Sequence, residues 1–510
     1  MHKFLKLGLL PVMFIVCASA MSCNAIKKEV ALITDVGDID DGSFNQTSWE
    51  AIKNYCNNPE HPHTYDYYRP FADSDYARRC AIKQAVYKGA QIIVCPGFKF
   101  AYTVGVSQKD YPNVHFVLLD SDTHQNDDAQ TPIDIEKNTV CVCFQSEISG
   151  YLAGYSIAYD YIENDFSVER HIRDKYGYGF VGGDNAPGVY PYGFGFIQGV
   201  VAGTDAACKK HSVDIGYYPK LEFRYNYAKV YAQSDEAAAK VKSWYDDDKL
   251  SIKTVFPCGG KLYQSITEGV KDYNRKNNLY DFTEGDVPRE AARWVGVDSD
   301  QYAGLKDEHE KKTIITSALK GLDEAIGTAL HFHYLGEEVW NSAIGGPAIV
   351  NETTHEVEQR EWILGLKSQF GREDTEEPKR YDVERKNYVG IPTITKEGSD
   401  VIRGFSRFTK ALYDEEVDKI DDDSIVYNGD GTGLYKKIGD NYEPYPAPAG
   451  VPTFMNFSDE SNPETRYVYA LTKKRNNYND DPDPASPMVT FREKYLCKYP
   501  GALLNITVID

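Results

Sequence analysis

The chain has 510 residues and a formal net charge of −21 at pH 7. This length predicts two or three domains, because single domains usually hold about 100–200 residues. The acidic balance argues against nucleic acid or an anionic lipid surface as the main partner, since both attract faces rich in Lys and Arg. A small, neutral or polar ligand fits better, and no nucleic-acid partner is expected.

The first residues have the pattern of an export signal. Lys3 and Lys6 precede the apolar run LGLLPVMFIVCASAM, which leads to Cys23. Basic, apolar and then small residues are typical of a signal peptide, here residues 1–22. The run is shorter than the roughly 20 residues that span a bilayer. The stretch AMSC resembles a bacterial lipobox, so we expect lipidation at Cys23, with an ordinary secretory peptide as the alternative.

Apolar strands alternate with helical segments along most of the chain. VALITD, QIIVCPG and HFVLLDS are strand-like runs, and the rhythm resumes with YGFVGG, IKTVFPCGG and RWVGVDSD. This alternation predicts an α/β fold with parallel sheets covered by helices. Two such blocks meet near EISGYLAGYSIAYDYI and predict two doubly wound lobes. After about Gly404 the turn-rich pattern predicts a small, β-rich C-terminal extension.

The cysteines say little about function. Cys95 and Cys258 sit at the ends of apolar runs and are expected to be buried thiols. An export context permits disulfides, and a bond between Cys56 and Cys80 stays open.

Polar and glycine residues follow the predicted strands. They are Asp35, Gly97, Asp120, Gly259 and Asp298. Because loops at the carboxyl ends of parallel strands form the ligand crevice, these residues mark a candidate site. Their position alone does not distinguish metal binding, catalysis and ligand recognition.

The carboxylates of ALITDVGDIDDGSFNQTSWEA, residues 31–51, could suggest a metal site. An EF-hand loop with Gly42 at its sixth position would need acidic residues where Gly37 and Ile39 stand. A calcium-dependent nucleoside hydrolase is a closer alternative, but Ile33 replaces the first aspartate of that motif. No activated nucleophile, metal site or cofactor motif is recognised elsewhere. We therefore expect no enzyme, no metal and no cofactor.

Five segments in order carry a family resemblance: TDVGDIDDGSFNQTSWE, FQSEISGYLAGYSIAYD, GFVGGDNAPGVYPYGFGFIQG, WVGVDSDQ and TSALKGLDEAI. Together they resemble the basic membrane protein family of bacterial substrate-binding lipoproteins, whose best-known members are purine nucleoside receptors. The resemblance implies a type I periplasmic-binding-protein fold, with two Rossmann-like lobes joined by a hinge. The chain should cross the hinge near Ile148, near Asp300 and between about Trp340 and Thr395.

The resemblance also implies a partition of the chain. Lobe 1 is expected in residues 27–147 with 300–340, lobe 2 in 148–299 with 360–400, and the extension in 404–510. The role of the extension stays open.

The family's ligand positions can be placed on this sequence residue by residue. Asp35 and Asn45 should meet the edges of a base, and Phe44 should stack on its face. The other implied ligand-binding residues are Asp120, Asp298 and Lys320 on the ribose side, Gly259 and Gly260 where backbone approaches the sugar, and Tyr231 as a second aromatic. Tyr231 stands two residues before Gln233, where the family has its aromatic. Asp38 and Asp40 are expected to cap a helix or face solvent, while Asp41 stays open between capping and ligand contact.

These features predict a monomeric, lipid-anchored protein on the extracytoplasmic face of the cell membrane. It would capture nucleosides, chiefly purine nucleosides, between two lobes and deliver them to the permease of an ABC transporter. The alternatives are the hydrolase above and a surface signalling or host-interaction protein on the same fold. The presence of Asp298 and Lys320 favours the transport function.

Overall fold

The structure, a computed structural model, describes only part of the chain. The described residues are 27–35, 37–123, 133–184, 186, 188–214, 217–281, 287–288, 290–343, 361–364, 387–421, 425–427, 434–438, 441–444 and 504–508. The predicted signal peptide and Cys23 lie outside them. Within the described part, no helix combines the length and the apolar character that crossing a membrane requires.

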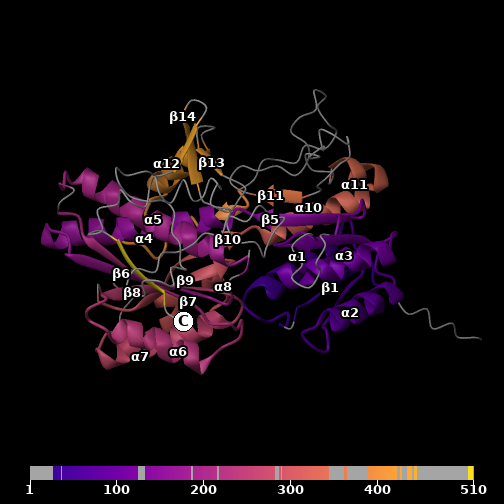
Figure 1. Ribbon diagram of the computed structural model, residues 1–510, viewed down its shortest axis with the longest axis horizontal. Coiled ribbons are helices and arrows are strands. Elements are labelled where there is room, and N and C mark those ends of the chain that lie inside the picture. The colour runs from indigo at the N-terminus through magenta and orange to yellow at the C-terminus, as the bar shows by residue number, and fades with distance from the viewer. Residues whose placement is uncertain are drawn as a thin grey trace, which may run out of the picture.

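The first lobe, whose N-terminal strands and helices are indigo in Figure 1, has a six-stranded sheet in the order β11-β5-β4-β3-β1-β2. Its strands are β1 Val30–Ile33, β2 Tyr65–Tyr68, β3 Ile92–Pro96, β4 His115–Leu119, β5 Thr139–Phe144 and β11 Glu361–Leu364. All of its strand pairs are parallel. The helices are α1 Phe44–Cys56, α2 Asp75–Tyr87, the 3-10 turn η1 Phe98–Phe100, α3 Ala101–Asp110, α10 Leu322–Leu335 and α11 Glu337–Ala343.

The second lobe has a seven-stranded sheet in the order β12-β10-β9-β8-β6-β7-β16. Its strands are β6 Lys175–Gly182, β7 Lys220–Tyr227, β8 Ile252–Cys258, β9 Arg293–Asp298, β10 Ile314–Lys320, β12 Val389–Gly390 and β16 Leu504–Val508. The helices are α4 Ser146–Glu169, α5 Tyr190–Lys210, α6 Asp235–Asp246, α7 Leu262–Lys276, α8 Gln301–Gly304, α9 Glu308–Thr313 and α12 Lys410–Asp421. Only β12 pairs antiparallel among these described strands.

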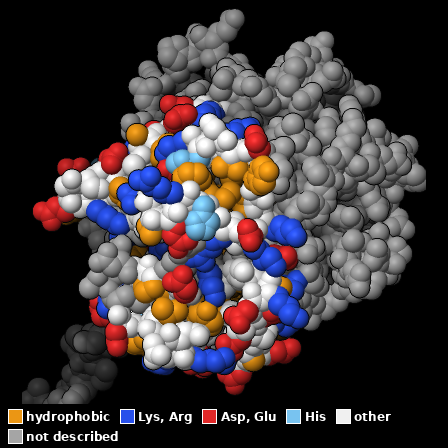
Figure 2. Space-filling model, turned by 90° about the vertical axis from the view of Figure 1, so that its left-hand side faces the viewer, with side chains coloured by type: hydrophobic (Ala, Val, Ile, Leu, Met, Phe, Trp, Pro, Cys, Tyr) orange, Lys and Arg blue, Asp and Glu red, His pale blue; other side chains and the backbone are white. Residues whose placement is uncertain are grey.

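The predicted α/β class with two lobes is confirmed. The apolar runs become central strands buried on both faces, as expected of parallel sheets covered by helices. The thiols of Cys95 and Cys258 are buried and free, and Cys56 and Cys80 are also free thiols. Figure 2 shows the outer side of the second lobe, where acidic and basic side chains lie interspersed around small hydrophobic areas.

Helices α4 and α5 pack with almost no space between their backbones. A Cβ atom at Gly195 would lie 1.8 Å from the Glu147 carbonyl oxygen, and one at Gly150 would lie 2.1 Å from the Tyr192 carbonyl oxygen. Any larger side chain would force the two helices apart. This close approach fixes the start of α5, which carries Tyr192 toward the space between the lobes.

The strand orders correct two predicted lobe boundaries. Strand β10 lies in the second sheet beside β9, although residues 300–340 were expected in the first lobe. Strand β11 lies in the first sheet beside β5, although residues 360–400 were expected in the second. The chain leaves the second sheet after Lys320, since α10 packs on α1, and not near Asp300. An apolar strand has the same local pattern in either sheet, so the sequence does not show which sheet it joins.

Of the described parts of the C-terminal extension, some form a sheet of their own and others pack onto the second lobe. Strands β13 Ile425–Tyr427, β14 Leu434–Ile438 and β15 Asn441–Pro444 form a separate antiparallel sheet. Helix α12, by contrast, places Glu416 in the interior, where its carboxylate accepts a hydrogen bond from the Tyr151 hydroxyl at 2.6 Å. Strand β16 adds a parallel strand to the edge of the second sheet, beside β7.

Candidate functional site

Charged side chains from both lobes converge where three strands end. The Lys320 Nζ lies 2.7 Å from Asp120 Oδ2 and 3.7 Å from Asp298 Oδ1. It also donates a hydrogen bond to the Gly188 carbonyl oxygen at 3.1 Å. Lys320 and Asp298 come from the second sheet, whereas Asp120 follows β4 of the first. We call Asp120, Asp298 and Lys320 the deep cluster.

The deep cluster is largely hidden from water. Lys320 is 3% exposed and Asp298 is 6% exposed. Burial disfavours the ammonium of Lys320, but Asp120 and Asp298 outweigh it, so the pKa of Lys320 is raised. Burial raises the pKa of the Asp298 carboxyl, and Lys320 opposes that change. Polar groups held in so low a dielectric can form strong, directional hydrogen bonds with a ligand.

Both acidic residues of the deep cluster have an unusual backbone. Asp120 has φ 64° and Asp298 has φ 65°, which is the left-handed region. Residues other than glycine rarely adopt it, and such backbone conformations concentrate at functional sites. At Asp120 and Asp298 the two strands end in turns from which both carboxylates reach Lys320.

Two residues that the sequence analysis did not select complete the surroundings of Asp298. The Ser43 hydroxyl of the first lobe donates to Asp298 Oδ2 at 3.0 Å. The Tyr192 hydroxyl at the start of α5 donates to Asp298 Oδ1 at 3.2 Å. Both residues lie inside motifs that carry the family resemblance, and this was the one signal available for them.

Phe44 lies beside the deep cluster. Its ring centroid is 5.6 Å from the Lys320 Nζ, and the ring of Tyr192 is 4.8 Å from the same atom. Phe44 is only half-buried. The two rings therefore flank a buried ammonium, an arrangement that stabilises the charge and keeps apolar surface next to polar groups.

The start of α1 depends on Asp41. Its carboxylate accepts backbone hydrogen bonds from Ser43, Asn45 and Gln46 at 2.9–3.1 Å. Burial raises the pKa of Asp41, while these hydrogen bonds oppose the rise. The question left open for Asp41 is thus answered by capping, since a carboxylate at a helix N-terminus satisfies amides that lack helical partners.

Asn45 does not have the free amide group that direct base recognition would need. Its Nδ2 donates to Asp41 Oδ2 at 2.9 Å and to Asp35 Oδ1 at 2.8 Å, which uses both amide hydrogens. Its Oδ1 accepts from the Asp35 backbone at 3.3 Å. In this arrangement Asn45 orients Asp35, and the expectation that both residues meet a base edge stays a prediction.

A second region, which we call the outer cleft, opens between the lobes with a volume of about 980 Å³. Its charged lining residues are Asp35, Asp38, Asp40, Asp41, Arg69, Asp73, Asp75, Arg78, Lys99, Asp184, Lys229 and Lys261. Asn45, Tyr231 and Gly260 line it too, whereas Phe44, Gly259 and the deep cluster do not. The structure therefore divides the predicted site residues into two groups.

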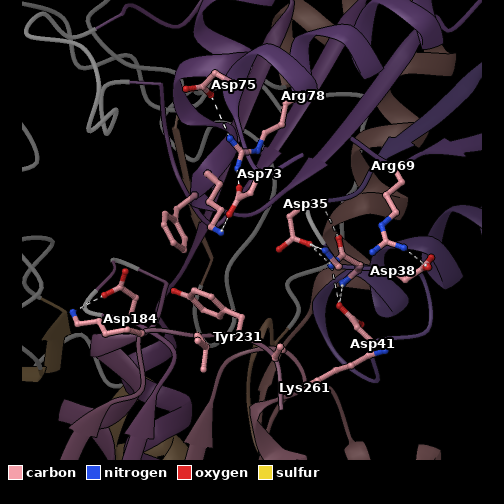
Figure 3. Close-up of a pocket in the computed structure, with 18 of the residues that line it drawn as sticks. Asp35, Asp38, Asp41, Arg69, Asp73, Asp75, Arg78, Asp184, Tyr231 and Lys261 are labelled. Atoms are coloured by element: carbon pink, nitrogen blue, oxygen red, sulfur yellow. Dashed lines mark hydrogen bonds and ion pairs between the residues drawn. The ribbon is translucent and has the colours of Figure 1, made fainter. Parts of the chain in front are cut away.

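Every cation that lines the outer cleft is paired with a carboxylate, and Figure 3 shows Arg69 beside Asp38 and Arg78 beside Asp73 and Asp75. The pairs are Arg69 with Asp38 at 2.9 Å, Lys99 with Asp73 at 2.6 Å, Lys229 with Asp184 at 2.9 Å, Lys261 with Asp40 at 3.2 Å, and Arg78 with Asp73. The Lys261–Asp40 pair joins the two lobes. The side chain of Asp40 is 80% exposed, which agrees with its expected position in solvent.

Tyr231 lies in the outer cleft, whereas Gln233 is exposed and donates to Glu268 at 3.5 Å. Phe98, which the sequence analysis missed, faces Tyr231 from the first lobe with ring centroids 6.2 Å apart. The only signal for Phe98 was its place directly after Gly97, at the end of a predicted strand.

In the part of the chain that the structure describes, no group of three or more His, Cys, Asp and Glu side chains is arranged to hold a metal ion. The deep cluster instead pairs its carboxylates with an ammonium, which makes it suited to recognition of hydroxyl groups.

Residues 28–344 match the family of PnrA-like substrate-binding proteins of ABC transporters. The chain belongs to this family. Its members are substrate-binding components of transporters and not enzymes, which excludes the hydrolase alternative. The family therefore places the chain outside the cytoplasm, in association with a membrane transporter.

Named relatives share about a quarter of their residues with this chain. The ABC transporter nucleoside-binding protein BmpA of Lactococcus lactis is 25% identical over 299 residues, which cover 57% of this chain and 71% of BmpA. The CD4+ T-cell-stimulating antigen of Listeria monocytogenes is 24% identical over 304 residues, covering 58% of this chain and 71% of the antigen.

Solved structures of solute-binding proteins are also similar. One from Aeropyrum pernix has a TM-score of 0.44 at 18% identity and covers 61% of this chain and 71% of its own. One from Conexibacter woesei has a TM-score of 0.45 at 15% identity and covers 77% of this chain and 94% of its own.

Proposed function

We propose that this protein captures nucleosides, chiefly purine nucleosides, between its two lobes and delivers them to an ABC transporter permease. The observation that supports this most is the deep cluster beside Phe44. A nucleoside combines a ribose diol with a flat base, and the two parts need different partners. A carboxylate can accept both hydroxyl hydrogens of a diol, while an aromatic ring can stack on a base.

The individual roles follow from this chemistry. Asp298 would accept the ribose hydroxyls, and Lys320 would hold that carboxylate in place while donating to a sugar oxygen. Phe44 would stack on the base, and Asp35, oriented by Asn45, would read a polar edge of the base. Gly259 and Gly260 have positive φ angles. Gly260 lines the outer cleft and would let the ligand approach the backbone, whereas the Tyr231 ring covers Gly259.

Ligand entry would require the lobes to separate. The Ser43–Asp298 and Lys320–Asp120 contacts both join the first lobe to the second, and the deep cluster does not line the outer cleft. Opening at the hinge would break these contacts, and closure would replace them with contacts to the ligand. Hinge closure around a ligand is the usual conformational change of two-lobed binding proteins.

Lipid attachment at Cys23 belongs to the same proposal. Cys23→Ala should release the expressed chain from the membrane fraction, whereas Cys56→Ala should leave it membrane-bound, because Cys56 is a buried thiol of the first lobe. Fractionation followed by immunoblotting measures this. A Cys23→Ala chain that stays in the membrane fraction would contradict the anchor.

Thermal-shift measurement of the full chain tests ligand class. Purine nucleosides should raise the melting temperature, since a ligand at about 100 times its Kd adds about 2.7 kcal/mol to stability. Free bases and ribose alone should have much smaller effects. If no nucleoside shifts melting while another solute does, the proposed ligand class is wrong. If no solute binds at all, the surface signalling or host-interaction alternative gains support.

A further inference from the structure

Tyr231 and Phe98 face each other across the outer cleft. Phe98 follows β3 of the first lobe and Tyr231 follows β7 of the second, and their ring planes are tilted by 50°. The Lys99 Nζ lies 5.7 Å from the Tyr231 ring centroid. Figure 3 shows Tyr231 between the charged groups of the two lobes. Its ring therefore forms part of the lining of the cleft on the side of the second lobe.

The position of the Tyr231 ring is fixed by two glycines. A Cβ atom at Gly183 would lie 2.5 Å from Tyr231 Cε1, and one at Gly259 would lie 2.8 Å from Cδ1. The ring edge thus packs directly on the backbone at the ends of β6 and β8. The Lys261 backbone N–H also donates to the Tyr231 carbonyl oxygen at 2.8 Å. A side chain held in this way is preorganised for contact with a ligand.

The hydroxyl of Tyr231 has an unmet hydrogen-bonding capacity. Its oxygen is buried, and no residue that the structure describes donates to it or accepts from it. A buried hydroxyl without a partner destabilises a fold, because it has lost its hydrogen bonds to water and gained none in return. On the preceding strand, the hydroxyls of Tyr225 and Tyr227 bond to each other at 3.0 Å. The buried hydroxyl of Tyr178 on β6 also lacks a described partner, so what distinguishes Tyr231 is its place in the lining of the outer cleft.

The charge around Tyr231 keeps its proton in place. Burial, followed by the negative charges of Asp184, Asp120 and Asp35, raises the pKa of Tyr231 well above its ordinary value. The groups that act on it come from the outer cleft and from the deep cluster. A hydroxyl that stays protonated between these two regions is a permanent hydrogen-bond donor.

We propose that the Tyr231 hydroxyl donates a hydrogen bond to an acceptor atom of the bound ligand and thereby contributes to specificity. Phe98 supports the opposite side of the cleft and limits how far the ligand can move away from that hydroxyl. This inference rests on the proposed nucleoside function and deepens it. An aromatic ring alone stacks on any base, but a hydroxyl distinguishes ligands that carry the acceptor from those that lack it.

Isothermal titration of the full chain tests the inference. The ligands are inosine and analogues that each lack one acceptor, namely purine riboside, 7-deazainosine, 3-deazainosine and the 2′-, 3′- and 5′-deoxynucleosides. Tyr231→Phe should bind inosine about 3- to 10-fold more weakly, the range for one neutral hydrogen bond. For the analogue without the contacted acceptor, wild type and Tyr231→Phe should bind equally. That analogue shows whether the acceptor lies on the base or on the ribose.

A matched control and a stability measurement separate specificity from structure. Tyr227→Phe removes the hydroxyl of a half-buried tyrosine on the preceding strand, one that bonds to Tyr225 and does not line the outer cleft. It should bind every ligand as wild type does. Because the Tyr231 hydroxyl has no described partner, Tyr231→Phe should melt at the wild-type temperature or above it, whereas a structural role would lower the melting temperature.

Two results would overturn the inference without affecting the proposed function. One is wild-type affinity of Tyr231→Phe for inosine, and the other is the same fold loss for every analogue. If the wild-type protein binds none of these nucleosides, the proposed function itself fails and the inference fails with it. Phe98→Leu should weaken all analogues alike, since it removes a ring and no hydrogen bond.

Discussion

The deep cluster and the outer cleft contain the same kinds of residue but differ in burial. Both place Asp and Lys side chains at the carboxyl ends of strands, and both join the two lobes. Lys320 is 3% exposed, whereas the side chains of Lys261 and Asp40 are 37% and 80% exposed. Removing one partner of a buried pair leaves an uncompensated charge and costs about 3–5 kcal/mol, while an exposed pair contributes about 0–1 kcal/mol. Burial therefore decides which charges can recognise a ligand.

The largest expected effect is in the deep cluster. Asp298→Ala should cost about 2–5 kcal/mol of nucleoside binding, because it removes one partner of a buried, hydrogen-bonded set of charges. Titration calorimetry with a ribonucleoside and its 2′-deoxy analogue measures the effect. The deoxy analogue should bind the wild type more weakly but lose less from the mutation. Equal losses for both sugars would show that Asp298 does not read the diol.

Removal of the neighbouring ring should have a smaller effect. Phe44→Ala should weaken binding by about 1–3 kcal/mol, the value of one stacked base, and Phe44→Tyr should be nearly silent. The same titrations measure both variants. An unchanged affinity in Phe44→Ala, with Asp40→Asn losing binding instead, would place recognition in the outer cleft and reverse the comparison.

His115 and His333 form a third group of titratable side chains, and the carboxylate beside them is exposed. His115 and His333 bond through their Nδ1 atoms at 2.8 Å, and His115 stacks on Trp340 at 3.8 Å. The Glu337 side chain, which is 76% exposed, lies 3.1 Å from His115 Nε2. Burial lowers the pKa of both histidines from 6.5 to about 4. Unlike Lys320, they are therefore neutral at pH 7.

The lowered pKa values of His115 and His333 make the stability of the fold depend on pH. Between pH 6.5 and 4 the unfolded chain binds more protons than the folded one at these histidines, so stability is full above 6.5 and falls as the pH drops toward 4. Urea unfolding at pH 7, 6 and 5 should show this decline, and His333→Gln should reduce its slope. His171→Gln serves as the control, because the His171 side chain is 67% exposed. An unchanged slope in His333→Gln would contradict the assignment.

The smallest effect is expected in the outer cleft. Lys261→Met and Asp40→Asn should each change nucleoside affinity and melting temperature by less than about 1 kcal/mol, since their ion pair is exposed. A double-mutant cycle on melting and binding measures their coupling, which should shrink further in high salt. A coupling of several kcal/mol would make this pair a latch that holds the lobes closed.

Much of the fold was predictable because it depends on local patterns. Apolar runs of strand length alternating with helical segments specify parallel sheets, and such sheets gather the residues that follow their strands at one edge. That is why Asp120 and Asp298 could be named before their contacts were known, whereas Lys320 was named from the family resemblance. Asp40 was expected to cap a helix or face solvent, and its side chain is 80% exposed.

What the sequence by itself determined is therefore the alternation of elements, the family motifs and the edge of the sheets at which the site lies. Only the tertiary structure decided which sheet β10 and β11 join, because the local sequence of a strand does not indicate which strands lie beside it. It also decided that Asn45 is committed to Asp41 and Asp35, and that Ser43 reaches Asp298, 255 residues away in the chain. These contacts depend on the closure of two lobes, so no local pattern specifies them.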